Sequence, residues 1–297
     1  MKKLKKEWTF HLLLLPSVIM VLIFCYVPMF GIAIGFMDYS PAKGFAKASF
    51  VGFKHFQTLF NNPNFILALK NTMIIAGLKI VTGLVVPLIL ALMMNEVRRN
   101  YFKRTVQTLI YLPYFISWVM MAGIIIDIFS PTGGIVNNFL GMFGVEPIYF
   151  LGSNKWSRFT IILTNIWKDA GWGTIIFMAA LTGIDLNLYE AAIMDGAGRW
   201  KQTLHVTIPG ILPTIILVGT LSLANVLNAG FDQIYNLMAP VTLESLDIID
   251  TLVYRLGIDN GQFSLATAAG LFKSVVSCFF IVMSYKLADK YAGYKLF

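Results

Sequence analysis

The sequence predicts an all-α integral membrane protein with six transmembrane helices. Hydrophobic residues make up 57% of the 297 residues, and charged residues make up only 13%. Soluble domains carry about 25% charged residues, and a single soluble core of this length does not bury so much apolar surface. The apolar residues also form runs long enough to cross a bilayer, which takes about 20 residues in a helix. These observations exclude an ordinary soluble enzyme, a disordered chain and a nucleic-acid-binding module.

Six apolar runs define the expected spans. Three runs contain no Lys, Arg, Asp or Glu, and they cover residues 8–37, 105–126 and 206–231. Three further runs contain one or two charged residues, which are Lys79, Lys168 with Asp169, and Lys273. We therefore expect transmembrane helices near residues 10–36, 69–94, 107–129, 159–182, 207–233 and 263–287.

The basic residues between the runs predict the orientation of the chain. The net charge is +8, and basic residues cluster at residues 2–6, 98–104, 199–201 and 286–295. Loops rich in Lys and Arg face the cytoplasm, so both termini of this multi-pass protein are expected inside. The loops expected outside lie near residues 38–68, 130–158 and 234–262.

The stretch between the fourth and fifth expected spans differs from the other loops. Within residues 185–209, Glu190-Ala191-Ala192 begins a short helical pattern. Gly196 and Gly198 follow, and glycine tolerates the positive φ that often ends a helix. The sequence therefore predicts a short cytoplasmic helix that ends in a tight turn.

The same stretch has a surface suited to docking. Its Ala and Gly residues allow another backbone to approach closely, and Glu190 and Asp195 offer charges to a partner's Lys or Arg. A second amphipathic turn leads on to Pro209, where we expect the segment to bend into the bilayer. This pattern predicts a rigid projection that a soluble partner protein contacts.

The spacing in this loop resembles the signature of permease subunits of ATP-binding-cassette importers. That signature reads Glu-Ala-Ala, three residues, Gly, nine residues, then a hydrophobic residue, any residue, a hydrophobic residue and Pro. Here it is formed by Glu190-Ala191-Ala192, Gly196 and Val206-Thr207-Ile208-Pro209. The flanking Asp195-Gly196-Ala197 and Phe231-Asp232-Gln233-Ile234 resemble the sugar-transporting branch. Within this MalF- and UgpA-like branch, the chain resembles the LplB-type permeases of polysaccharide and oligosaccharide importers.

This resemblance implies a fold, a function and a set of partners. The implied fold is the type I importer (MetI-like) permease fold, with residues 1–297 forming one transmembrane permease domain in the inner or plasma membrane of a bacterium. The implied function is import of a carbohydrate, an oligo- or polysaccharide, into the cytoplasm. The implied partners are a second permease subunit in a heterodimer, two ATP-binding-cassette ATPase subunits and an extracellular or periplasmic solute-binding protein. No nucleic acid is expected.

The resemblance also assigns the residues that dock the ATPase. They are Glu190, Ala191, Ala192, Asp195, Gly196 and Pro209. In the family, ATP binding closes the ATPase dimer, draws the docking helices together and turns the spans from inward-open to outward-open. The chain has no Gly-x4-Gly-Lys-Ser/Thr phosphate loop. It is therefore expected to be non-catalytic and to bind no cofactor or metal, with ATP and Mg²⁺ held by the partner ATPase.

Polar and aromatic residues in the expected spans are candidates for a substrate pathway. A sugar needs aromatic faces for its apolar side, and amides and carboxylates for its hydroxyl groups. The candidates are Tyr114, Asn165, Trp167, Trp172, Asn225, Asn228 and Asp232. Asn225, Asn228 and Asp232 follow at i, i+3 and i+7, which places them on one face of the fifth expected helix. A polar seam between helices explains this stripe equally well.

Other functions fit parts of the sequence. An ion-coupled secondary transporter carries its whole pathway in one chain, often as an internal repeat of spans, and no repeat is visible here. An intramembrane enzyme needs clustered catalytic groups, whereas His11, His55 and His205 are scattered. An importer of the same class for a non-sugar solute remains an alternative. Dependence on a separate ATPase distinguishes the importer from the first two alternatives.

Overall fold

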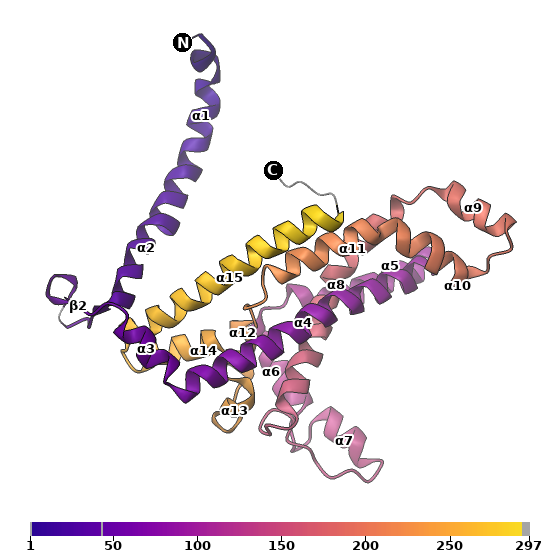
Figure 1. Ribbon diagram of the computed structural model, residues 1–297. Helices are drawn as coiled ribbons and strands as arrows, with labels where there is room; N and C mark the ends of the chain where they lie inside the picture. Colours follow the sequence, from indigo (N-terminus) through magenta and orange to yellow (C-terminus); the bar gives the residue numbers. More distant parts are fainter. Residues whose placement is uncertain (1, 43, 293–297) are drawn as a thin grey trace. The chain divides into compact units, whose positions relative to one another are not determined.

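The computed structural model describes residues 2–42 and 44–292, and most of these residues are helical (Figure 1). Within this part, β1 (Met37–Asp38) and β2 (Ser49–Phe50) form an antiparallel pair of two-residue strands. The all-α class predicted from the sequence is confirmed. Met1, Lys43 and residues 293–297 lie outside the described residues, and with them both ends of the expected permease domain and part of the basic segment 286–295.

The helices have the following bounds. The α-helices are α1 (Lys2–Val21), α2 (Val27–Met29), α3 (Lys54–Phe60), α4 (Pro63–Asn95), α5 (Asn100–Tyr111), α6 (Trp118–Ile128), α7 (Ile135–Gly141), α8 (Ser157–Thr182), α9 (Leu186–Met194), α10 (Arg199–Gln202), α11 (Ile208–Leu223), α12 (Phe231–Leu237), α13 (Leu243–Leu246), α14 (Ile249–Tyr254) and α15 (Phe263–Ala292). The 3₁₀ segments are η2 (Phe30–Phe36), η3 (Phe45–Lys47), η4 (Leu112–Phe115) and η6 (Pro240–Thr242). The π-helical turns are η1 (Leu22–Tyr26), η5 (Thr203–Thr207) and η7 (Arg255–Asp259).

The long helices match the length of a membrane span. Four helical stretches in the described residues are long and apolar enough to cross a bilayer, and they are Phe10–Phe36, Pro63–Asn95, Arg199–Leu223 and Phe263–Lys286. Two further pairs pass the same test but are bent, Asn100–Phe115 with Trp118–Ile128 by 109° and Ser157–Thr182 with Leu186–Met194 by 71°. Counting each bent pair as one span gives up to six spans.

The third expected span, 107–129, is interrupted in its middle. The chain leaves the α-helix at Tyr111, forms the 3₁₀ turn η4 and is extended at Ile116. Ser117 then caps α6, because its Oγ accepts a hydrogen bond from the Met120 N–H at 3.3 Å. Pro113 has no N–H to continue the helical ladder. Pro113 in this run predicts a kinked helix, and the structure bends here by 109°, although it forms two separate helices instead of one.

The fifth expected span, 207–233, is also interrupted. α11 ends at Leu223 and α12 begins only at Phe231. Gly230 has a φ of +88°, a conformation that glycine adopts without a steric penalty. The Asn228 Oδ1 accepts a hydrogen bond from the Gly230 N–H at 3.3 Å, which stabilises the turn. The turn formed by Asn228 and Gly230 therefore interrupts the helix although the apolar run continues. The expected helix 207–233 is wrong beyond Leu223.

The chain forms two compact units. One comprises the chain up to Phe65 together with Leu252–Lys273, and the other comprises Ile66–Thr251 together with the chain from Ser274. In the first unit, the rings of Phe60, Phe65 and Phe272 form a cluster with centroid distances of 5.3 to 5.7 Å. In the same unit, the Ser264 Oγ in α15 donates to the Met37 carbonyl in β1 at 2.6 Å and so joins this helix to the strand pair.

The second unit has an apolar core in two clusters. The larger cluster joins α4, α6, α8 and α12, and its buried members include Ile75, Met121, Ile125, Ile161 and Ile234. The smaller cluster joins α4, α8 and α11 through Ala91, Phe177, Leu181 and Ile211. α8 therefore packs against every other long helix that forms this core.

A buried polar network holds the segment after α12 in the second unit. The Arg158 Nη2 donates to the Asn71 Oδ1 at 2.8 Å and to the Ser245 carbonyl at 3.1 Å. The Asn71 Nδ2 donates in turn to the Glu244 and Asp247 carbonyls at 3.0 and 3.1 Å. These bonds tie α4 and α8 to α13 at one end of the unit.

Two glycines on α8 allow its neighbours to come close. A Cβ atom at Gly171 would overlap the backbone carbonyl of Ile110 in α5. A Cβ atom at Gly173 would lie 2.8 Å from the Cγ of Pro87 in α4. Small residues at such crossings are typical of helix packing in membranes.

Replacing Gly171 tests this packing. We expect Gly171→Ala to lower the free energy of unfolding by about 1–3 kcal/mol, because the obstacle is backbone and does not move aside. Gly77→Ala in α4 is the control, since a Cβ there meets nothing within 4 Å. The measurement is the thermal unfolding midpoint in detergent. Equal midpoints for the two variants would contradict the close packing of α5 on α8.

Candidate functional site

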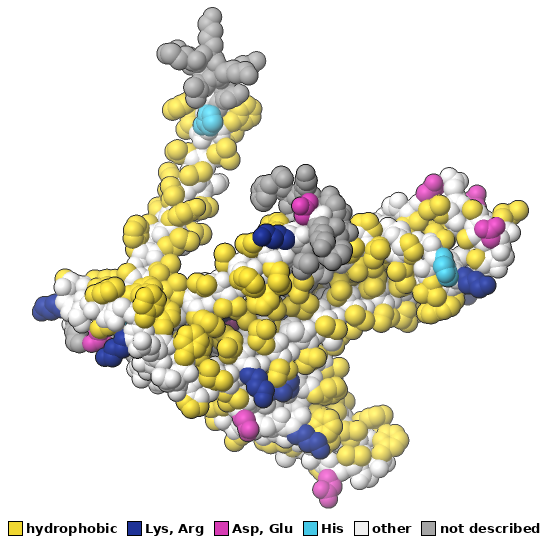
Figure 2. Space-filling model, viewed as in Figure 1, with side chains coloured by type: hydrophobic (Ala, Val, Ile, Leu, Met, Phe, Trp, Pro, Cys, Tyr) yellow, Lys and Arg dark blue, Asp and Glu magenta, His cyan; other side chains and the backbone are white. Residues whose placement is uncertain are grey.

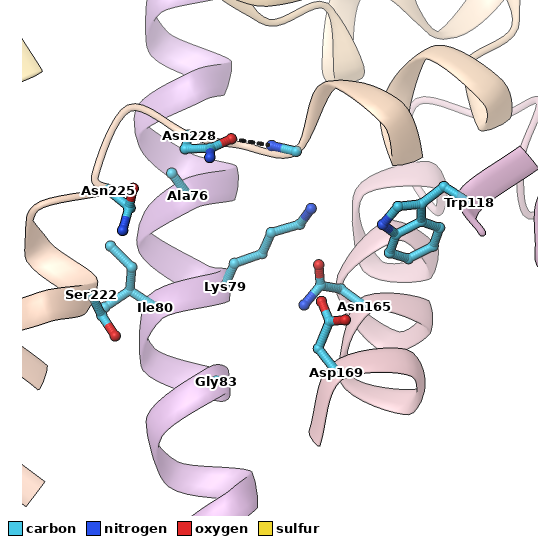
Figure 3. A pocket seen from close by; sticks show the side chains of 11 residues that line it. Ala76, Lys79, Ile80, Gly83, Trp118, Asn165, Asp169, Ser222, Asn225 and Asn228 are labelled. Atoms are coloured by element: carbon cyan, nitrogen blue, oxygen red, sulfur yellow. Dashed lines mark hydrogen bonds between the residues drawn. The ribbon is translucent and has the colours of Figure 1, made fainter. Parts of the chain in front are cut away.

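A polar cavity lies in the second unit beside the break in the fifth expected span. It has a volume of about 320 Å³ and is bounded by α4, α6, α8 and the chain around the end of α11 (Figure 3). Its polar and aromatic lining residues are Lys79, Trp118, Asn165, Asp169, Ser222, Asn225 and Asn228. This volume is at the lower end of the range for small-molecule sites. Amides, a hydroxyl, a carboxylate and an indole ring together suit a ligand rich in hydroxyl groups.

Three of the seven pathway candidates line this cavity. They are Asn165, Asn225 and Asn228. Asp232 lies in the first turn of α12, is exposed and does not line the cavity. Asn225, Asn228 and Asp232 share no helical face because α11 ends at Leu223. The two asparagines reach the cavity from irregular backbone instead.

The three aromatic candidates lie elsewhere. Trp167 and Trp172 are 46% and 48% exposed, and neither lines the cavity. The Trp172 ring stacks on the Tyr114 ring with centroids 4.8 Å apart and an interplanar angle of 7°. This stack joins α8 to η4, the 3₁₀ turn in the third expected span. The aromatic residue in the cavity wall is Trp118, which begins α6.

Lys79 binds the backbone at the break after α11. Its Nζ donates to the Ala229 carbonyl at 2.7 Å and to the Gln233 Oε1 at 2.5 Å. The Gln233 Nε2 donates to the Ile161 carbonyl at 2.7 Å and to the Thr164 Oγ1 at 2.9 Å. One lysine and one glutamine therefore join α4 and α8 to the irregular segment and α12.

Lys168 has the corresponding position at the other break. It is only 6% exposed, and its Nζ donates to the Tyr114 carbonyl in η4 at 2.8 Å. The ammonium also lies 5.3 Å and 5.4 Å from the ring centroids of Tyr114 and Trp118, within the range of cation–π attraction. Each interrupted span thus has a backbone carbonyl that accepts a hydrogen bond from a lysine on a neighbouring helix.

Asp169 is the acidic group of the cavity. It follows Lys168 on α8, and Figure 3 shows its carboxylate and the Lys79 side chain extending into the same space. Its partly buried carboxylate interacts electrostatically with Lys168 and Lys79, and nearby positive charge lowers the cost of an acidic group within a membrane protein. Among the described residues, no group of three His, Cys, Asp or Glu side chains is placed to hold a metal ion.

Sequence patterns identified the charged residues in the spans but not their partners. An ionisable residue in an apolar run indicates an interior or cavity-facing position, and this applies to Lys79, Lys168 and Asp169. Gln233 has no charge to mark it as an interior residue, and its place in Phe231-Asp232-Gln233-Ile234 indicates the family branch but not its contacts. Its contacts with Ile161 and Thr164 arise from the tertiary fold.

The expected cytoplasmic helix is α9, which lies with α10 at one end of the α8 and α11 pair (Figure 1). The Asp185 side chain caps its start by accepting a hydrogen bond from the Asn187 N–H at 2.9 Å. Its end is a Schellman motif, in which Gly196 has a φ of +75° and the Ala197 N–H donates to the Ala192 carbonyl at 2.9 Å. The positive φ predicted for Gly196 is confirmed. Gly198 has a φ of −68°, so the prediction for that residue is wrong.

α9 exposes most of its surface. None of its residues is buried, and Met194 is 86% exposed. Glu190, Ala191, Asp195 and Gly196 are exposed and Ala192 is partly so, and Figure 2 shows acidic side chains at this end of the molecule. An exposed apolar patch with a charged rim marks a protein-binding surface.

Pro209 lies outside α9. It is an exposed residue in the first turn of α11, and the helical stretch Arg199–Leu223 runs through it. The chain therefore remains helical through Pro209. The π-helical turn η5 lies just before Pro209. A π-turn shifts the hydrogen-bond spacing by one residue, near a proline that has no N–H to donate.

The fold and these two sites define a class of protein. Residues 83–292 match the family described as the binding-protein-dependent transport system inner membrane component, and the chain belongs to this family. It is a permease component of an ABC transporter, embedded in a bacterial inner membrane, as the resemblance in the docking loop predicted.

Individual relatives are similar over nearly the whole chain. Protein LplB of Bacillus subtilis (strain 168) is 43% identical over 297 residues, which cover 100% of this chain and 93% of LplB. The polygalacturonan/rhamnogalacturonan transport system permease protein YteP of the same organism is 43% identical and covers 97% of this chain and 90% of YteP.

Solved structures agree with the fold. A crystal structure of a bacterial ABC transporter involved in the import of the acidic polysaccharide alginate contains a chain with 39% identity and a TM-score of 0.90, and the match covers 98% of each chain. A second crystal structure shows the alginate transporter in complex with an alginate pentasaccharide-bound periplasmic protein; its chain is 40% identical with a TM-score of 0.90 and covers 98% of this chain and 97% of its own length. The importer permease fold is therefore confirmed.

Replacing Lys79 tests its hydrogen bonds at the break after α11. We expect Lys79→Met to lower the free energy of unfolding by about 1–3 kcal/mol, because it leaves the Ala229 carbonyl and the Gln233 Oε1 without their donor. Lys70→Met, at an exposed position of the same helix, is the control. Thermal unfolding in detergent measures both. A stable Lys79→Met variant would mean that another donor satisfies the break.

Proposed function

We propose that this chain is the membrane-spanning permease subunit of an ATP-driven, binding-protein-dependent importer that carries an oligo- or polysaccharide into the cytoplasm. The observation that carries this proposal is α9, an exposed helix with Glu190-Ala191-Ala192 on it and a Gly196 turn after it. A helix fixed at both ends and exposed along its length presents a preorganised docking surface. α9 contacts the turn η5, and the helical stretch that contains η5 ends beside the cavity.

The chemistry of the cavity supports a carbohydrate as the substrate. Asn165, Asn225 and Asn228 supply donors and acceptors for hydroxyl groups, and Asp169 supplies a strong acceptor. Trp118 supplies an aromatic face for the apolar side of a sugar ring. The names of YteP and of the alginate transporter refer to polysaccharides, and we extend this substrate class to the present chain.

The remaining subunits of the importer supply what this chain lacks. We propose a heterodimer with a second permease, two ATPase subunits docked on the cytoplasmic side and an external solute-binding protein. ATP and Mg²⁺ bind to the ATPase subunits, and this chain binds no cofactor and catalyses no reaction. Both termini lie in the cytoplasm, which places α9 on the side of the ATPase and follows the excess of basic residues there.

Two substitutions test the docking surface. We expect Glu190→Arg and Gly196→Ala to reduce co-purification of the ATPase with the tagged chain, the first through charge reversal and the second through strain of about 1–2 kcal/mol at positive φ. Glu146→Arg is the control for the first, since Glu146 is exposed in a different loop. Gly198→Ala is the control for the second, because Gly198 has a negative φ and open space around its Cα. Mass spectrometry of the purified complex measures each subunit, and unchanged ATPase recovery with both test variants would contradict the proposal.

A third substitution tests the cavity. We expect Asn228→Leu to reduce uptake of labelled galacturonan or alginate oligosaccharides about tenfold, because it removes polar contacts worth about 1.4 kcal/mol while the complex still assembles. Asn64→Leu, at an exposed position outside the cavity, is the control. Uptake by Asn228→Leu at the rate of the unmodified chain would remove this residue from the pathway.

A further inference from the structure

A chain of hydrogen bonds links α9 to the start of the fifth span. The Tyr189 hydroxyl lies 2.9 Å from the Thr207 Oγ1. The Thr207 hydroxyl donates to the Gln202 carbonyl at 3.4 Å, which leaves its oxygen free to accept the Tyr189 proton. The Gln202 Nε2 donates to the Ala197 carbonyl at 2.7 Å, in the turn that follows α9. The bonds therefore pass from α9 through the π-helical turn η5 and back to the turn after α9.

The position of Tyr189 is unlike that of its neighbours. It is half-buried, whereas Leu188 and Glu190 on either side of it are exposed. Thr207 is almost fully buried at the junction of η5 and α11. The docking residue Glu190 thus faces outward, while the residue before it reaches inward to the base of the fifth span.

The fifth span connects this contact to the cavity. Arg199–Leu223 is one continuous helical stretch, and Ser222 near its end lines the cavity. Movement of α9 is therefore transmitted to the cavity only if α9 and the start of this stretch move together. Backbone connection alone is weak here, because the intervening turn contains Gly196 and Gly198.

We propose that Tyr189 is a positioning residue that couples the docking helix to the fifth span through Thr207. Its hydroxyl holds α9 at a fixed distance from η5, so that movement of the docked ATPase is transmitted to α11 and the cavity. This inference rests on the proposed function, since it requires an ATPase bound at α9. It assigns coupling to Tyr189 and docking to Glu190.

The test separates coupling from docking. Cys25 and Cys278 are replaced by Ser, and Ser222→Cys introduces a thiol in the cavity wall. The complete complex is reconstituted in nanodiscs, and the rate at which a hydrophilic maleimide modifies this thiol is measured with and without MgATP and vanadate. ATP hydrolysis and ATPase content are measured on the same samples. The variants are Tyr189→Phe and Thr207→Val, which remove a hydroxyl, and Thr207→Ser, which keeps it.

We expect ATP to change the modification rate in the parent and in Thr207→Ser. In Tyr189→Phe and Thr207→Val we expect this change to fall about fivefold, the effect of losing one hydrogen bond, with ATPase content unchanged. The double variant should behave like Thr207→Val alone, because both substitutions remove the Tyr189–Thr207 bond and only Thr207→Val also removes the bond to the Gln202 carbonyl. A full ATP-dependent change in Tyr189→Phe would overturn the coupling role. Loss of the ATPase from Tyr189→Phe would overturn it as well, by making Tyr189 a docking residue, whereas ATPase retention by Glu190→Arg would count against the proposed function instead.

Discussion

Two expected spans of the second unit are interrupted, and backbone carbonyl groups at each interruption lose their helical hydrogen bonds. The structure of this unit depends on supplying these carbonyl groups with new donors. Inside a bilayer, water does not compensate such groups, so each needs a donor from the protein. Lys168 donates a hydrogen bond to the Tyr114 carbonyl in the third expected span, and Lys79 donates one to the Ala229 carbonyl after α11. The two lysines come from α8 and α4, which are unbroken through this region. Two continuous helices thus stabilise two interrupted ones.

The interruptions are also what make the cavity polar. Asn225 and Asn228 line the cavity from irregular backbone after Leu223. They are not arranged as a stripe on one face of a helix. Gln233 fixes the far side of this segment by bonding both Lys79 and α8. Because one lysine holds both the Ala229 carbonyl and Gln233, the shape of the cavity wall and the stability of the break depend on the same contact.

The sequence predicts the fold class and the docking helix well, because both depend on signals that are local in the chain. Apolar runs reveal the spans, and Gly196 after Glu190-Ala191-Ala192 reveals the end of α9. Pro113 predicts a kink in the third expected span but not a full break, because Ser117, which caps α6, lies in an apolar run. The break after α11 was missed because Asn228 and Gly230 lie in a run that is typical of one continuous helix. The choice of Trp118 over Trp167 and Trp172 for the cavity wall depends on which helix face meets a neighbour. No periodicity in a single sequence contains that information.

The continuous stretch Arg199–Leu223 gives the two sites a physical connection. Its 25 residues span roughly 37 Å at the rise of an α-helix, from the docking region to the cavity wall. The stretch is continuously helical, and the contacts at its two ends fix its position. At one end the π-helical turn η5 is fastened by the Thr207 hydroxyl, and at the other the backbone becomes irregular and is held through Lys79. The stretch also packs against α8 through Ile211, so the docking region, the apolar core and the cavity wall are connected through one helix.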